Sequence, residues 1–148
     1  MPAPFEFFLF RCGCAQEAAG VAHYVRTGAQ YQYYYPLSKQ YSLALNSEVG
    51  LGRGLNGQPY PIFKSFFVGG LGSVRGFDQG SLGPRDITGL VIGGAKKLVM
   101  NAEFFIPFPG AGNDKSLRLY GFYDMGNVFG ENEAIRLSQL RSSYGMGI

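Results

Sequence analysis

Histidine and cysteine, the side chains most used for metal binding and nucleophilic catalysis, are almost absent from this sequence. His23 is the only histidine, and Cys12 and Cys14 are the only cysteines. Together they supply at most three soft ligands, which is weak support for a metal site. One histidine outside the patterned part of the chain also argues against a Ser/His/Asp or Cys/His catalytic set. The sequence therefore predicts no metal, no cofactor and no enzymatic activity.

Long apolar runs and strong charge are lacking as well. No apolar stretch approaches the ~18 residues of a transmembrane helix. A membrane location stays open, because a lipid-facing barrel strand shows only alternation of apolar and polar residues. Charged residues make up 16% of the chain, the net charge is +3, and the basic residues are scattered. This pattern gives no indication of a nucleic-acid partner.

Glycine and tyrosine, by contrast, are abundant, with 23 and 10 copies in 148 residues. High glycine with aromatic residues suits short strands and tight turns, so the predicted fold class is all-β. From Tyr24 onward, apolar and polar residues alternate with a period of two. The alternation predicts five antiparallel strands, at about residues 24–35, 41–52, 97–106, 117–126 and 142–148. Residues 1–23 fit no strand pattern and are predicted to be a leader, disordered or preceding the true start.

Two architectures fit this alternation. A soluble β-sandwich, acting as a binding module, would bury the apolar face of each strand. A transmembrane barrel is favoured by strands of about 9–11 residues and by short turns that alternate with long loops. Tyr31, Tyr33 and Tyr35, close to a strand end, resemble an interfacial girdle, although an aromatic core stripe would look the same.

The longest loop, about residues 53–93, carries the most unusual stretch of the chain, Phe66–Asp86. This stretch is rich in glycine yet too apolar for a solvated linker, which predicts a loop that folds back and packs. Arg75 lies at its centre among apolar neighbours, where a guanidinium needs a carboxylate partner. The alternative is a surface hairpin with an exposed arginine.

Two carboxylates are placed to be that partner. Glu103 and Asp124 lie on the polar faces of adjacent predicted strands, and the loop with Arg75 runs directly into the first of them. We therefore expect Arg75 to contact both, through charge-assisted hydrogen bonds. Together with Glu48 these acids could instead be solvated residues or an acid/base pair, although nothing sets their separation. The G-x-G-x-x-G match at 52–57 is followed by prolines at 59 and 61, so no phosphate-binding helix can begin there.

Three motifs in order resemble those of the BamA-type outer-membrane assembly barrels. Val74-Arg75-Gly76-Phe77 is similar to the V-R-G-F/Y tip of that family's long inward-folded loop. Residues 94–107 resemble its G…N-x-E-x-x-x-P strand, and residues 122–129 resemble its F-x-D-x-G-x-V-F/W strand. Residues 81–86 are most similar to the assembly members of the family. The likeness covers about residues 24–148.

The resemblance implies a Gram-negative outer-membrane location, a lipid bilayer around the strands and a role in folding and inserting client β-barrel proteins. It also implies accessory lipoproteins bound through other domains, and a loop tip of Val74, Arg75, Gly76 and Phe77 that meets the barrel lumen, where Arg75 contacts Glu103 and Asp124. A sixteen-stranded barrel is implied, of which about five strands would lie here. We thus expect residues 24–148 to be a partial barrel domain, inactive alone and truncated before the closing strands. A two-partner secretion transporter or a passive pore remains the alternative.

Overall fold

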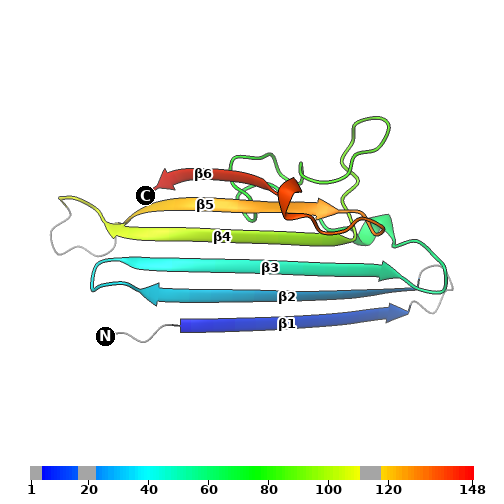
Figure 1. Cartoon of the computed structure of the whole chain (residues 1–148), viewed down its shortest axis with the longest axis horizontal. Coiled ribbons are helices and arrows are strands. Elements are labelled where there is room, and N and C mark those ends of the chain that lie inside the picture. The colour runs from blue at the N-terminus through cyan, green and yellow to red at the C-terminus, as the bar shows by residue number, and fades with distance from the viewer. Residues whose placement is uncertain (1–4, 17–22, 111–117) are drawn as a thin grey trace.

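Six antiparallel strands form one sheet in the computed structural model, in the order β1-β2-β3-β4-β5-β6 (Figure 1). The structure describes residues 5–16, 23–110 and 118–148, the first range through its backbone only. The elements are β1 (Phe5–Gln16), β2 (His23–Pro36), β3 (Ser42–Gly54), η1 (Ile62–Lys64), β4 (Lys96–Pro107), β5 (Arg118–Phe129), η2 (Leu137–Gln139) and β6 (Arg141–Gly147). Among the described residues, no helix has the length and apolar character needed to cross a bilayer.

The all-β, antiparallel expectation is confirmed, but the number of strands and the start of the sheet differ from the prediction. Phe5–Gln16 is not part of a leader, because it forms β1 and pairs with β2 along its whole length. Its run of phenylalanines hides any period of two, so only the pairing partner identifies it as a strand. Residues 1–4 and 17–22 of the predicted leader, and the side chains of Cys12 and Cys14, lie outside the described part.

The strand register brings the polar side chains of successive strands together. One row of paired residues crosses five strands, namely Gln32, Asn46, Asn101, Asp124 and Ser143. Because side chains alternate along each strand, the residues two positions away lie on this same polar face. The opposite, apolar face carries stacked rings, with Tyr33 lying between Tyr31 and Tyr35 at 6.4 and 6.2 Å. The predicted faces are therefore those of the folded sheet.

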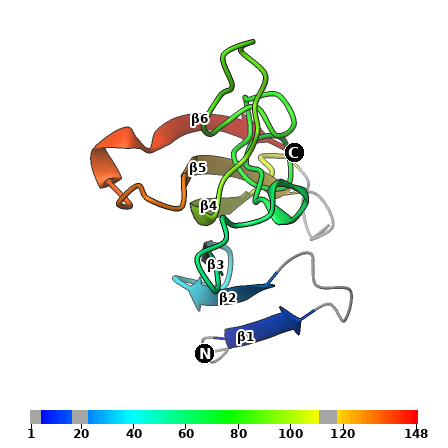
Figure 2. The same ribbon diagram turned by 90° about the vertical axis from the view of Figure 1, so that its right-hand side faces the viewer.

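The long loop between β3 and β4 lies against the polar face, where Figure 2 shows it beside β4, β5 and β6. Its apolar residues meet the few apolar residues of that face. The resulting core contains Phe66, Val68, Val74 and Leu82 from the loop and Val99 and Val128 from the strands. The loop is therefore packed and inward-folded, as its composition predicts, and the core of the chain lies between loop and sheet.

Glycines in β3 make room for the first part of this loop. A Cβ added at Gly52 would lie 2.5 Å from the ring of Tyr60, so the two groups could not coexist without a shift. The Tyr60 ring is buried there with Tyr24 and Ala95, and it meets the Tyr24 ring edge-on at 5.9 Å. The absence of a side chain on the strand thus fixes where the loop begins to pack.

Gly52→Ala is expected to destabilise the fold by about 1–3 kcal/mol, because overpacking forces the buried ring to move. Gly121→Ala is the matched control, since Gly121 is also a strand glycine but an added Cβ would lie 4.0 Å from its nearest neighbour, the backbone oxygen of Gly145. Urea unfolding followed by circular dichroism measures both variants. Equal midpoints for the two would contradict the packing of Tyr60 over Gly52.

Candidate functional site

The tip of the long loop, Val74–Phe77, is held in a fixed shape over the polar face. Val74 is fully buried in the core, and Phe77 packs against the same cluster. Gly76 has φ +86°, a left-handed conformation that side chains other than glycine rarely adopt. This turn lets Val74 point into the core while Arg75 points along the sheet. Gly76 is thus required by the backbone of the turn, and Val74 and Phe77 by its packing against the core.

Arg75 and Asp124 form a two-pronged ion pair at the centre of the site. The Nε and Nη2 atoms of Arg75 donate to Oδ2 and Oδ1 of Asp124 at 2.6 and 2.8 Å. The backbone N–H of Arg75 also donates to Oδ2, at 3.1 Å. These hydrogen bonds raise the pKa of Arg75 above its ordinary value, so the guanidinium stays charged. The paired planar groups fix the direction of the loop tip as well as its position.

The same guanidinium contacts a second acid and an aromatic ring. Its Nη1 atom lies 2.6 Å from Oε1 of Glu103 on β4. Its carbon Cζ lies 3.9 Å from the centre of the Phe122 ring on β5, a cation–π contact. The Asp124 side chain has no exposed surface, whereas that of Glu103 is 29% exposed. Asp124 is therefore the buried anchor and Glu103 the outer, partly hydrated one.

A chain of side-chain amides supports Asp124, and the sequence did not single it out. The Nδ2 atom of Asn101 donates to Oδ1 of Asp124 at 2.9 Å and to the carbonyl of Ser73 at 2.6 Å. Asn46 donates to Asn101 at 3.0 Å, and Gln30 donates to Asn46 at 3.2 Å. Asn101 could have been found by its place two residues before Glu103 on the same face, but the links to Asn46 and Gln30 depend on strand register.

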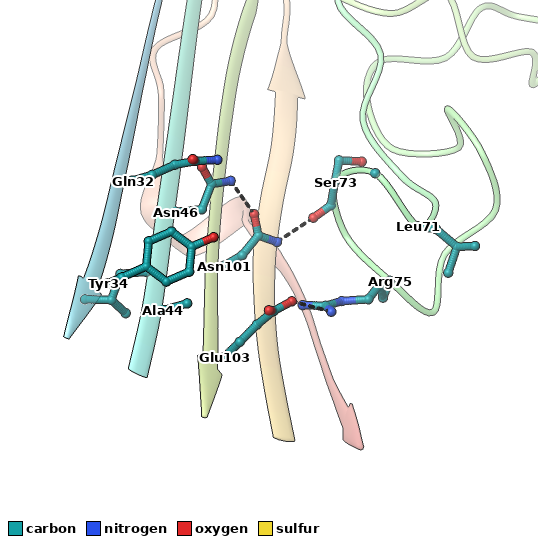
Figure 3. Close-up of a pocket in the computed structure, with 11 residues that line it drawn as sticks. Gln32, Tyr34, Ala44, Asn46, Leu71, Ser73, Arg75, Asn101 and Glu103 are labelled. Carbon is teal, nitrogen blue, oxygen red and sulfur yellow. Dashed lines mark hydrogen bonds and ion pairs between the residues drawn. The ribbon is translucent and has the colours of Figure 1, made fainter. Parts of the chain in front are cut away.

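A pocket of about 230 Å³ opens beside this network, between the loop tip and β2, β3 and β4. Figure 3 shows Arg75 and Ser73 reaching into it from the loop, with Glu103 and Asn101 facing them from β4. Its walls hold hydrogen-bonding groups, consistent with a water-filled space on the polar face. The network is therefore buried at Asp124 and open at Glu103.

The structure brings together all six residues predicted to form the loop contact, which are Val74, Arg75, Gly76, Phe77, Glu103 and Asp124. Glu48 is not part of the group, because it pairs with Lys97 at 2.5 Å. Asp124 and Glu103 are both paired with the guanidinium of Arg75, an arrangement that suits a structural contact better than proton transfer. The 52–57 stretch ends β3 and turns, and no helix begins within or directly after it, since the short η1 starts only at Ile62, beyond both prolines.

Comparison with known proteins places this geometry in a family. The Omp85 superfamily domain matches residues 7–148. The chain belongs to the Omp85 superfamily. Among similar proteins, the outer membrane protein assembly factor BamA of Neisseria meningitidis is 41% identical over 116 residues, 69% of this chain. BamA of Nitratidesulfovibrio vulgaris is 38% identical over 73 residues, 48% of this chain.

Solved structures agree on the Omp85 fold. A crystal structure of BamA from Haemophilus ducreyi lacking POTRA domains 1–3 superposes with a TM-score of 0.73 at 20% identity, over 97% of this chain and 35% of that one. The chain spans 15% of the length of the Neisseria relative and 9% of the Nitratidesulfovibrio relative. The match beginning at residue 7 agrees with β1 being part of the Omp85 barrel wall.

Asp124→Asn is expected to be the most damaging neutralisation in this Omp85 site. It leaves the Arg75 charge without its buried partner, and the new amide N–H group faces the N–H donors of Arg75 and Asn101. The free energy of unfolding should fall by about 3–5 kcal/mol. Glu103→Gln removes a partly exposed ion pair with Arg75. Glu48→Gln is the control, because it removes an ion pair with Lys97 instead. Each of these two changes should lower the free energy of unfolding by at most about 1 kcal/mol. Urea unfolding in detergent measures all three. Equal losses at Asp124 and Glu48 would refute the anchoring role of Asp124.

Proposed function

We propose that this chain forms part of an outer-membrane barrel that folds and inserts other β-barrel proteins into the outer membrane. The single observation that carries the proposal is the loop tip seated on the polar face through Arg75, Asp124 and Glu103. Its family and its BamA relatives, which are named outer membrane protein assembly factors, supply the biological setting. The chain is accordingly assigned to the outer membrane of Gram-negative bacteria.

Lipid is the first partner that this arrangement needs. The apolar face carries large exposed side chains, among them Leu45, Leu51, Phe104 and Tyr123, at 39–45% exposure. Such a face is costly in water and stable in a bilayer, whereas the polar face with its pocket suits a hydrated interior. The Tyr31–Tyr35 stack then lies at the level where aromatic rings meet the lipid headgroups. These features favour a barrel wall over a soluble binding module.

Client β-barrel proteins are the second proposed partner, and accessory lipoproteins, bound through other domains, the third. The role needs no covalent chemistry, so we propose that the protein is not an enzyme. Client strands gain backbone hydrogen bonds by pairing with strand edges, since unpaired N–H and C=O groups are costly in lipid. The seated loop braces the wall from inside while this exchange takes place. A two-partner secretion transporter or a passive pore would use the same brace for a different cargo.

Arg75→Ala in the intact protein is expected to reduce client insertion at least several-fold, because both carboxylates lose their partner and the loop tip loses its seat. Arg85→Ala is the control. Arg85 lies in the same loop, but its guanidinium donates to the carbonyls of Gly89 and Ser81 within that loop. The measurement is protease protection of a client barrel inserted into liposomes that contain the purified protein.

Three results would decide the proposal. Loss of insertion in Arg75→Ala with normal insertion in Arg85→Ala supports the loop brace. Normal insertion by folded Arg75→Ala overturns its role. A wild-type protein that conducts ions or exports a soluble cargo, without inserting clients, overturns the insertase assignment in favour of a pore or a secretion transporter.

A further inference from the structure

Besides the two acids at Arg75, another carboxylate holds the part of the chain where the long loop leaves the sheet. We call residues 54–64 the loop root. We propose that Glu131, in the loop between β5 and β6, is a positioning residue that fixes this root as Asp124 fixes the tip. This inference deepens the proposed function, and its second test rests on that function. The contacts themselves do not depend on it.

Glu131 bridges the two ends of a turn in the loop root. Its Oε1 atom accepts from the backbone N–H of Gly54 at 2.8 Å, and its Oε2 atom accepts from that of Tyr60 at 2.9 Å. Gly54 is the last residue of β3, and Tyr60 is the residue whose ring packs over Gly52. One side chain from a different loop thus joins the end of the strand to the first packed residue beyond it.

Both sides of this bridge are themselves fixed. On the root side, Tyr60 is buried, and its hydroxyl donates to the carbonyl of Lys64 at 2.9 Å. On the other side, the N–H of Gly130 donates to Oε2 of Glu133 at 3.0 Å, closing a short turn around Glu131. The Nζ atom of Lys96 then donates to the carbonyl of Glu133 at 2.6 Å, which ties that turn to β4. The bridge therefore connects two ordered segments.

The charges around Glu131 favour its ionised form. The N–H donors of Tyr60 and Gly54 hold the pKa of its carboxyl below the ordinary value, with help from Arg53 at the end of β3 and Lys96 at the start of β4. Glu133, in the same turn, is the other acid close by, and its carboxylate is engaged by Gly130. A carboxylate that accepts two backbone N–H groups is a stronger brace than a neutral acceptor.

Amide hydrogen exchange on the intact protein in detergent tests the brace directly. Glu131→Gln replaces one acceptor oxygen with an amide donor, so exchange across residues 54–60 should rise about tenfold or more at neutral pH. Glu48→Gln is the matched control, because Glu48 is a glutamate of β3 whose carboxylate pairs with Lys97 on β4. Unchanged exchange in Glu131→Gln, or an equal rise in both variants, overturns the proposal.

The pH dependence separates a charged brace from simple packing. The pKa of Glu131 is lower in the folded, bridged state than in a released one, so the bridge stabilises the root fully above the ordinary glutamate pKa of about 4.3. That stabilisation is lost as the pH falls through the lowered pKa. The difference in exchange between wild type and Glu131→Gln should therefore shrink toward acid pH. A difference that stays constant with pH would overturn the charged bridge.

Two further measurements complete the test. Heat-dependent gel mobility shows whether Glu131→Gln folds. If it does not, Glu131→Asp is used instead, because it keeps the charge but is too short to span both donors. Amide exchange in Glu131→Asp should be faster than in wild type and slower than is expected for Glu131→Gln. Client insertion should fall less in Glu131→Gln than in Arg75→Ala, since the tip stays seated. Raised exchange with normal insertion would keep Glu131 as the brace of the root and overturn only its contribution to insertion.

Discussion

The buried carboxylate of Asp124 is the constraint on which the rest of this structure depends. A carboxylate without exposed surface is costly unless donors surround it, and Asp124 receives three bonds from Arg75 and one from Asn101. Three of these four donors belong to the loop tip. The charge therefore favours one loop position strongly, because withdrawal of the loop removes three of the four donors to this carboxylate.

The strand register alone brings together the polar groups of the sheet that take part in this contact. Strand pairing puts Asn101 beside Asp124 and Asn46 beside Asn101 in one row, so the polar groups converge by register alone. Apolar packing then supplies the energy, through Val74 and Phe66 of the loop against Val99 and Val128 of the wall. The ion pair fixes the orientation of the loop tip, and the apolar core supplies most of the free energy that holds the loop on the sheet. A loop held by packing alone could slide along the strand, whereas a two-pronged ion pair does not allow it.

Much of this could be predicted from the sequence, because it depends on short-range patterns. A period of two fixes the faces of a strand, and an arginine among apolar loop residues points to acids on the neighbouring polar face. What could not be predicted depends on pairing partners. The phenylalanine run of Phe5–Gln16 shows no clear period, and the links from Gln30 and Asn46 to Asn101 need the register. Glu131 carries no local signal, because its partners are backbone N–H groups more than seventy residues earlier.

The two carboxylates that hold the long loop, Asp124 and Glu131, restrain different parts of it. Asp124 lies within β5 and holds a charged side chain, so it resists motion of the tip along the wall. Glu131 lies beyond the end of β5 and holds backbone N–H groups, so it resists unwinding of the root from β3. Asp124 lies in β5 and Glu131 lies two residues beyond its end, so a shift of that strand would move both carboxylates together. The two carboxylates thus hold the tip and the root of the loop, and Glu103 and Asn101 of β4 add contacts at the tip.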